Sequence, residues 1–145
     1  MRETDTLDRF IEAQEPVYEA VRSELASGQK RSHWMWFIFP QLRGLGRSPM
    51  AEHYGLAGHA EAVAYWEHAV LGGRLRECVD LLLAVPDRSA RDILGTPDDL
   101  KLRSCMTLFE AVAPDEPRFA RALDRFSGGQ RDPLTLKILG RSEPA

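Results

Sequence analysis

The chain contains 145 residues, 43% of them hydrophobic and 28% charged, with a formal net charge of -3 and a pI near 5.8. These values are typical of one soluble globular domain, and the acidic balance argues against a nucleic-acid polymer as a partner, which would require a basic face. The apolar run from Trp34 to Phe39 is far shorter than the roughly 18–20 residues of a membrane span, and the charged N-terminus is unlike a signal peptide. We therefore expect a cytoplasmic protein without membrane contact.

Two amphipathic helices are expected at the N-terminal end. Apolar residues recur at helical spacing from Thr6 to Gln14, and a second stripe follows Pro16, a residue that suits the first turn of a helix. Gly28 is expected to end this second helix, because glycine readily adopts the left-handed conformation that follows many helices.

The next segment, Lys30 to Gln41, reads Lys-Arg-Ser-His-Trp-Met-Trp-Phe-Ile-Phe-Pro-Gln and holds two of the three tryptophans. Ser32 is expected to cap a short helix from His33 to Phe39, which Pro40 ends. A strand is the alternative because aromatic residues favour sheets, but the alternation of apolar and polar residues is missing. Since the helix would be apolar on all sides, we expect it to lie buried at the centre of the fold.

The middle of the chain reads as a loop and further helices. Leu42 to Ser48 contains two glycines and two arginines and is typical of a loop, after which Pro49 opens a short helix. A following apolar segment is expected to break around Gly72-Gly73. A strong helical pattern then runs from about Arg74 to Val85.

The last third of the chain is also helical in pattern. Ser89 and Asp92 have the spacing of a capping box, and a long helix is expected to start at Thr96-Pro97 and stop at Pro114. Two more helices follow, and the tail of residues 140–145 is expected to be disordered beyond an ordered core of residues 6–139. The sequence thus predicts an all-α fold, a single compact domain of about eight short helices around a central aromatic-rich helix.

Several segments together resemble a bacterial family known as domain of unknown function 1810. They are Arg9-Phe10, Ala13-Gln14, Ser32 to Gln41, Val70-Leu71-Gly72 with Arg74-Leu75, and Asp99 to Phe109. The most specific signature is Ser-His-Trp-Met-Trp-Phe-Ile-Phe-Pro-Gln at 32–41, followed by Lys-Leu-Arg-Ser at 101–104 and Met-Thr-Leu-Phe at 106–109. The resemblance implies a compact all-α cytosolic protein without established activity, cofactor or catalytic residues. Some members carry the label calpastatin, the name of a disordered protease inhibitor, which this apolar chain does not support.

Two basic clusters suggest a binding site, one at Lys30 and one at Lys101. Each combines lysine, arginine and serine near an expected helix N-terminus, where backbone N–H groups and the helix dipole favour an anion. We predict a pocket for a small anionic ligand bearing phosphate or carboxylate, with a nucleotide-like molecule as one candidate, between the Lys30–Gln41 and Asp98–Phe109 segments. The expected ligand-binding residues are Lys30, Arg31, Ser32, Trp34, Trp36, Lys101, Arg103 and Ser104.

The tryptophans of this set could also be core residues. Residues two apart on a helix point about 200° from each other, so at most one of Trp34 and Trp36 should face a shared cavity. In the alternative for the charged residues, Lys30 and Lys101 are solvated, and Arg31 and Arg103 pair with carboxylates such as Asp98 or Asp99.

The sequence leaves enzymatic activity open. His33 and Asp99 are the candidates for acid and base in a hydrolytic reaction, since an imidazole titrates near neutral pH and a carboxylate beside cations can activate water. The chain has no HExxH, P-loop, Rossmann or nucleophile-elbow motif, so no named enzyme class is supported. His53, His59 and His68 lack metal-ligand spacing, and we predict neither a metal nor a cofactor.

Two other interpretations remain open. The chain is a protein-interaction module without a catalytic site if the loop from Arg43 to Met50 and nearby aromatic residues form a docking surface for a protein partner. The motif at 32–41 is purely structural if Arg31 and Arg103 are ion-paired and His33 is buried. Cys78 and Cys105 fall in apolar helical patterns and are expected to be buried reduced thiols.

Overall fold

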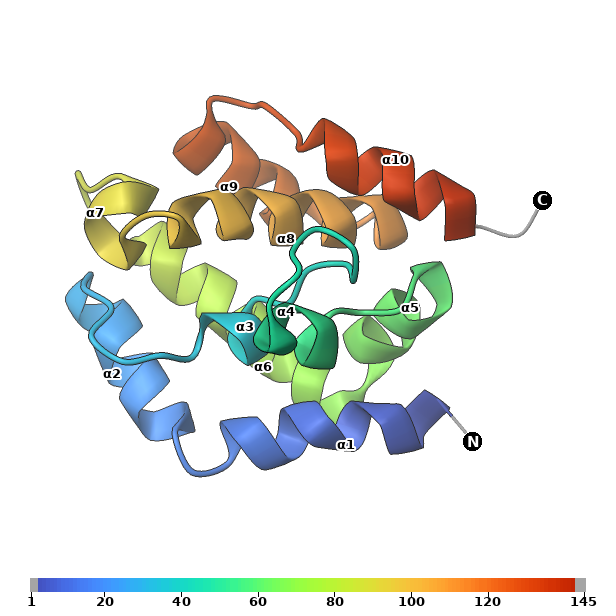
Figure 1. The fold of residues 1–145 in the computed structure, drawn as a ribbon. Helices are drawn as coiled ribbons and strands as arrows, with labels where there is room; N and C mark the ends of the chain where they lie inside the picture. The colour runs from blue at the N-terminus through green and yellow to red at the C-terminus, as the bar shows by residue number, and fades with distance from the viewer. Residues whose placement is uncertain (1–2, 143–145) are drawn as a thin grey trace.

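Helix α8, Asp98–Val112, crosses the centre of the molecule, and α5, α7, α9 and α10 pack against it (Figure 1). The computed structural model describes the backbone of residues 3–142 and the side chains of residues 7–140. Seven residues of α8 are buried, including Cys105, Leu108 and Phe109, which have no exposed surface. Burial on this scale makes α8 the centre of the hydrophobic core.

The described residues form ten helices and no strand. Their bounds are α1 Glu3–Gln14, α2 Tyr18–Ser27, α3 Met35–Ile38, α4 Pro49–Tyr54, α5 His59–Glu67, α6 Ala69–Ala84, α7 Ala90–Leu94, α8 Asp98–Val112, α9 Pro117–Ser127 and α10 Pro133–Ser142. The all-α single-domain prediction is confirmed, with ten helices in place of about eight. No helix in this part of the chain has the length and apolar character needed to cross a membrane.

Several helix boundaries lie where local chemistry predicts them. Gly28 ends α2 with a φ of 74°, in the left-handed region that favours glycine. The Ser48 hydroxyl accepts a hydrogen bond from the backbone of α4, and Ser89 and Asp92 form the predicted capping box at α7. Helix α10 continues past Gly140 to Ser142, beyond the point where the ordered core was expected to end, and residues 143–145 lie outside the described range.

The predicted break at Gly72-Gly73 is wrong, because α6 runs through both glycines. The chain turns instead at His68, whose Nδ1 accepts hydrogen bonds from the backbone N–H groups of Val70 and Leu71 at 3.1 and 3.2 Å. A Cβ atom on Gly72 would lie only 2.1 Å from the carbonyl oxygen of Trp66. The glycine therefore allows the end of α5 to pack directly on α6.

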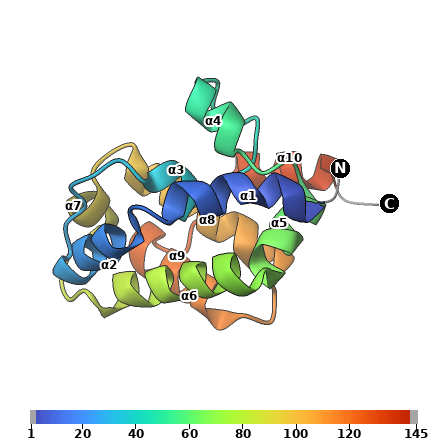
Figure 2. The same ribbon diagram turned by 90° about the horizontal axis from the view of Figure 1, so that it is seen from below.

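The central aromatic segment is buried as predicted, but its helix is shorter. Helix α3 spans only Met35–Ile38, and Trp34 precedes it without a side-chain cap. The Ser32 hydroxyl does not cap α3, because it donates to Glu24 instead. The loop after α3 leads to α4, which projects from the body of the molecule (Figure 2).

Candidate functional site

The first basic cluster is organised by Glu24, a buried residue of α2. Its Oε1 accepts hydrogen bonds from the backbone N–H groups of Arg31 and Ser32 at 2.7 and 2.9 Å and from Trp34 Nε1 at 2.9 Å. Its Oε2 accepts one from the Ser32 hydroxyl. Burial raises the pKa of Glu24, but these hydrogen bonds outweigh it and lower the pKa to about 2. The carboxylate thus stays charged and fixes the course of residues 31–34.

This arrangement corrects part of the predicted ligand-binding set. The side chain of Trp34 has no exposed surface, so it cannot contact a ligand in this conformation. The Ser32 hydroxyl is already bonded to Glu24. Arg31 and His33 are exposed, which contradicts the purely structural interpretation that required a buried His33.

The two basic clusters meet at Asp98, in the first turn of α8. Lys30 Nζ lies 3.0 Å from Asp98 Oδ2, and Lys101 Nζ lies 3.4 Å from Asp98 Oδ1. The Lys101 ammonium also lies 3.7 Å from the centre of the Trp36 ring, a cation–π distance. The alternative of solvated lysines is therefore wrong, because they share one carboxylate and join the two segments.

Arg103, one turn further along α8, has few polar partners for its guanidinium. Its side chain is 29% exposed, and its Nη2 lies 3.7 Å from Asp132 Oδ1. Its guanidinium makes no hydrogen bond with the described residues, and Nε is buried without a partner. Because a guanidinium carries five N–H donors, this cation retains unused capacity to bind an acceptor.

Asp132, the partner of Arg103, is by contrast fixed by several hydrogen bonds. Its Oδ2 accepts hydrogen bonds from the hydroxyls of Ser104, at 2.8 Å, and Thr135, and its backbone N–H donates to Thr107 Oγ1 at 3.0 Å. Burial raises the pKa of Asp132, but the two hydroxyls and the Arg103 guanidinium lower it overall. Asp132 therefore remains an anion, and its hydrogen bonds to the two hydroxyls fix the orientation of its carboxylate.

A cavity of about 290 Å³ lies between the two predicted segments, and we call it the Trp36 cavity. Its lining residues come from α3, the loop after it, α8 and the start of α10: Trp36, Gln41, Leu45, Gly46, Pro97, Leu100, Lys101, Arg103, Ser104, Asp132 and Leu134. Four of the predicted ligand-binding residues thus border one space, namely Trp36, Lys101, Arg103 and Ser104. Neither His33 nor Lys30 lines this cavity. Lys30 forms its ion pair with Asp98 instead.

A second cavity of about 270 Å³, which we call the Asp99 cavity, lies on the other side of Arg103. It is lined by Ser89, Ala90, Arg91, Asp99, Leu100, Arg103, Phe126, Ser127 and Gln130. Arg103 and Leu100 border both cavities. The two residues proposed for acid–base chemistry are therefore separated, because Asp99 lines this cavity and His33 lines neither.

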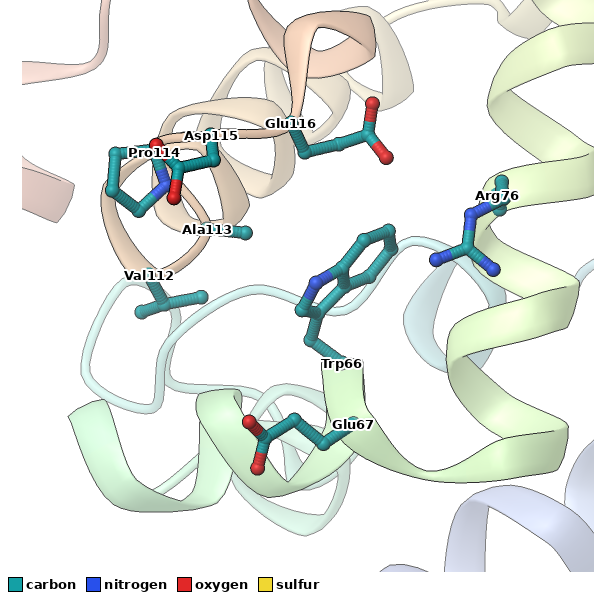
Figure 3. A pocket seen from close by; sticks show the side chains of 8 residues that line it. All are labelled: Trp66, Glu67, Arg76, Val112, Ala113, Pro114, Asp115 and Glu116. Carbon is teal, nitrogen blue, oxygen red and sulfur yellow. The ribbon is translucent and has the colours of Figure 1, made fainter.

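A more open groove of about 430 Å³ lies at the junction of α5 and α6, and sequence reasoning missed it. Figure 3 shows Trp66 standing in this groove, with Arg76 beside its ring and the carboxylates of Glu67, Asp115 and Glu116 around it. The Arg76 guanidinium lies 4.7 Å from the centre of the Trp66 ring. Three carboxylates against one arginine make this groove unsuitable for an anion.

The described residues show no metal centre and no reactive thiol. No group of three His, Cys, Asp or Glu side chains in this part of the chain is placed to hold a metal ion. Cys78 and Cys105 are buried free thiols, as predicted. Burial raises the pKa of Cys78 to about 12 and that of Cys105 well above its usual value, so both stay protonated near neutral pH.

Comparison with known proteins identifies a solved structure and a family model that match this chain. The crystal structure of the conserved hypothetical protein Rv1873 from Mycobacterium tuberculosis is 50% identical to this chain. The two superpose with a TM-score of 0.91 over 92% of this chain and 96% of the other. A search of curated proteins gives no significant match. The family model described as protein of unknown function (DUF1810) matches residues 4–139, so the chain belongs to this family.

Proposed function

We propose that the protein binds a small anionic ligand, bearing phosphate or carboxylate, in the Trp36 cavity. The observation that carries the proposal is the partly exposed Arg103 side chain, whose guanidinium makes no hydrogen bond with the described residues. Phosphate and carboxylate offer two acceptor oxygens that match the paired donors of arginine. Lys101 on the same wall adds a second positive charge, so the lining carries two cations against Asp132.

The position of Lys101 also narrows the type of contact. Its ammonium already lies over the Trp36 ring, so a planar group can stack on that face only by displacing the cation. An anionic group can instead contact the ammonium where it stands. The cavity is therefore better suited to the charged part of a ligand than to a stacked nucleobase.

Hydrolytic activity has less support than binding. His33 lies outside both cavities, and the carboxylate of Asp132 is held by two hydroxyls and kept ionised. A general base needs to reach the proton that it abstracts, by direct contact or through one water. Asp99 lines the neighbouring cavity, so a role as general base requires a ligand that extends past Arg103.

The interaction module is the second candidate, based on the projecting loop and helix α4 (Figure 2). Within the segment from Arg43 to Met50, Met50 is the one exposed large hydrophobic residue, with 41% of its surface exposed. A docking surface usually presents a contiguous apolar patch of several hundred Å². The Trp36 cavity, with several polar groups directed at one space, is the better-supported site.

A thermal-shift screen with inorganic phosphate, sugar phosphates and dicarboxylates tests the proposal. A ligand present at a hundredfold excess over its Kd should stabilise the fold by about 2.7 kcal/mol. Arg103→Gln should weaken binding roughly 10- to 100-fold, because it removes charge-assisted hydrogen bonds. Arg121→Gln, at an exposed position on α9, is the matched control and should bind like the wild type. The proposal is refuted if no anion raises the Tm, or if both variants behave alike.

A further inference from the structure

Two residues that line the Asp99 cavity, Asp99 and Arg103, each have one buried polar atom without a hydrogen-bond partner. Asp99 Oδ1 can only accept a hydrogen bond, and Arg103 Nε can only donate one. The two residues are four positions apart on α8, so they lie on the same face of the helix. Native proteins rarely leave buried polar atoms unpaired. Nearby Asp132 shows the usual outcome, because hydroxyl groups satisfy its carboxylate.

The residues around this cavity carry charges of both signs. Asp99 is the lining carboxylate, and Arg91 and Arg103 line the same space. A hydroxyl group is neutral and both donates and accepts, so it complements Asp99 and Arg103 together. Ser127 and Gln130 add neutral hydrogen-bonding groups to the wall. The lining thus suits a polyhydroxylated group.

The two cavities are placed so that one molecule can reach both. Leu100 and Arg103 form their common wall, and Leu100 is 53% exposed, so this wall reaches the protein surface. Each cavity is slightly smaller than a typical site for a drug-sized ligand, which occupies about 300–1,000 Å³, whereas the pair lies within that range. The Asp99 carboxylate can turn about its broad terminal torsion to direct an oxygen at a donor.

On the basis of the proposed anion site, we propose that its ligand is a sugar phosphate or a related phosphorylated polyol. Its phosphate contacts Arg103 and Lys101 in the Trp36 cavity, and its hydroxyl-bearing part extends over Leu100 into the Asp99 cavity. Arg103 contacts both parts, since this residue lines both spaces. Asp99 then acts as the residue that selects hydroxylated phosphate esters over inorganic phosphate.

Isothermal titration calorimetry with ribose 5-phosphate, inorganic phosphate and ribose tests this assignment. Wild-type protein should bind ribose 5-phosphate about tenfold more tightly than inorganic phosphate, and ribose weakly, because hydrogen bonds to a charged group add about this much affinity. Asp99→Ala should abolish the tenfold preference and leave the affinity for inorganic phosphate unchanged or stronger. Gln130→Leu, at an exposed position of the same lining, should reduce the preference in part. Asp115→Ala makes the same charge change in the groove around Trp66, and this variant should keep the tenfold preference.

The possible results separate the two proposals. If inorganic phosphate binds but ribose 5-phosphate binds no more tightly, the sugar-phosphate assignment is overturned and the anion site stands. If neither binds, the anion site itself fails. A preference that persists in folded Asp99→Ala, or a liganded crystal structure with only water beside Asp99, also overturns the assignment.

Discussion

Replacing Glu24 with alanine is expected to lower the free energy of unfolding by about 3–5 kcal/mol, a large part of the 5–15 kcal/mol typical of a domain. The change removes the acceptor of four hydrogen bonds from Arg31, Ser32 and Trp34. The indole N–H of fully buried Trp34 is then left without a partner. Urea denaturation at pH 7 measures the effect, and Glu12→Gln, at an exposed site on α1, should change stability by less than about 0.5 kcal/mol.

The effect of Glu24 should also depend on pH. Its pKa is about 2 in the folded protein and 4.5 ordinarily, so folding favours the charged form. The stabilisation is therefore complete above about pH 4.5 and declines as the pH falls towards 2, with an upper limit of about 3 kcal/mol. The difference in stability between wild type and Glu24→Gln should accordingly shrink between pH 5 and pH 2. A difference that stays constant over this range would contradict the assigned role of the carboxylate.

Gly72→Ala and Gly73→Ala are expected to have effects of opposite sign, although the two positions are adjacent in α6. A Cβ at position 72 would lie 2.1 Å from the carbonyl oxygen of Trp66, so the backbone of α5 or α6 has to move. Overpacking of this kind costs about 1–3 kcal/mol and at times more, and a clash with backbone belongs at the upper end. A Cβ at position 73 has no atom within 4 Å, so alanine should stabilise the helix by about 0.5–1 kcal/mol.

Thermal denaturation of the two glycine variants measures this contrast directly. Both substitutions lie in the same helix, so the gain in helix propensity from glycine to alanine is the same at each position. Equal stabilisation by both alanines would show that α5 does not press on α6 at Gly72. Equal destabilisation would show that the glycine pair is needed for a break in the helix, as the sequence predicted.

Local features of the fold were predictable because they depend on residues close in sequence. Gly28, Ser48 and the Ser89–Asp92 pair act within one helical turn, and each ends or begins a helix as expected. The boundary at His68 was missed because a glycine pair normally indicates a break, whereas Gly72 here meets a carbonyl of the preceding helix. That contact depends on how α5 and α6 pack, which helical periodicity does not reveal.

Some residues of the candidate site were also predictable from the sequence, and others were not. The motifs identified Trp36, Lys101 and Arg103, which line one cavity. Trp34 is buried, but it precedes α3, so the 200° argument for two residues of one helix does not account for its position. Glu24 was missed, because a single acidic residue on an amphipathic helix gives no signal that four donors will converge on it. Asp132 was missed for the same reason, since it lies 28 positions from Ser104, its partner.

The most direct test of the anion site is an NMR titration that follows the arginine Nε–Hε signals as inorganic phosphate is added. The signal of Arg103, assigned by its absence in Arg103→Lys, should shift progressively and saturate, while that of exposed Arg121 should move little. Binding of phosphate at the guanidinium predicts this result, because Arg103 lacks hydrogen-bond partners among the described residues. An Arg103 signal that does not move, or that moves only as much as that of Arg121, would contradict the proposal.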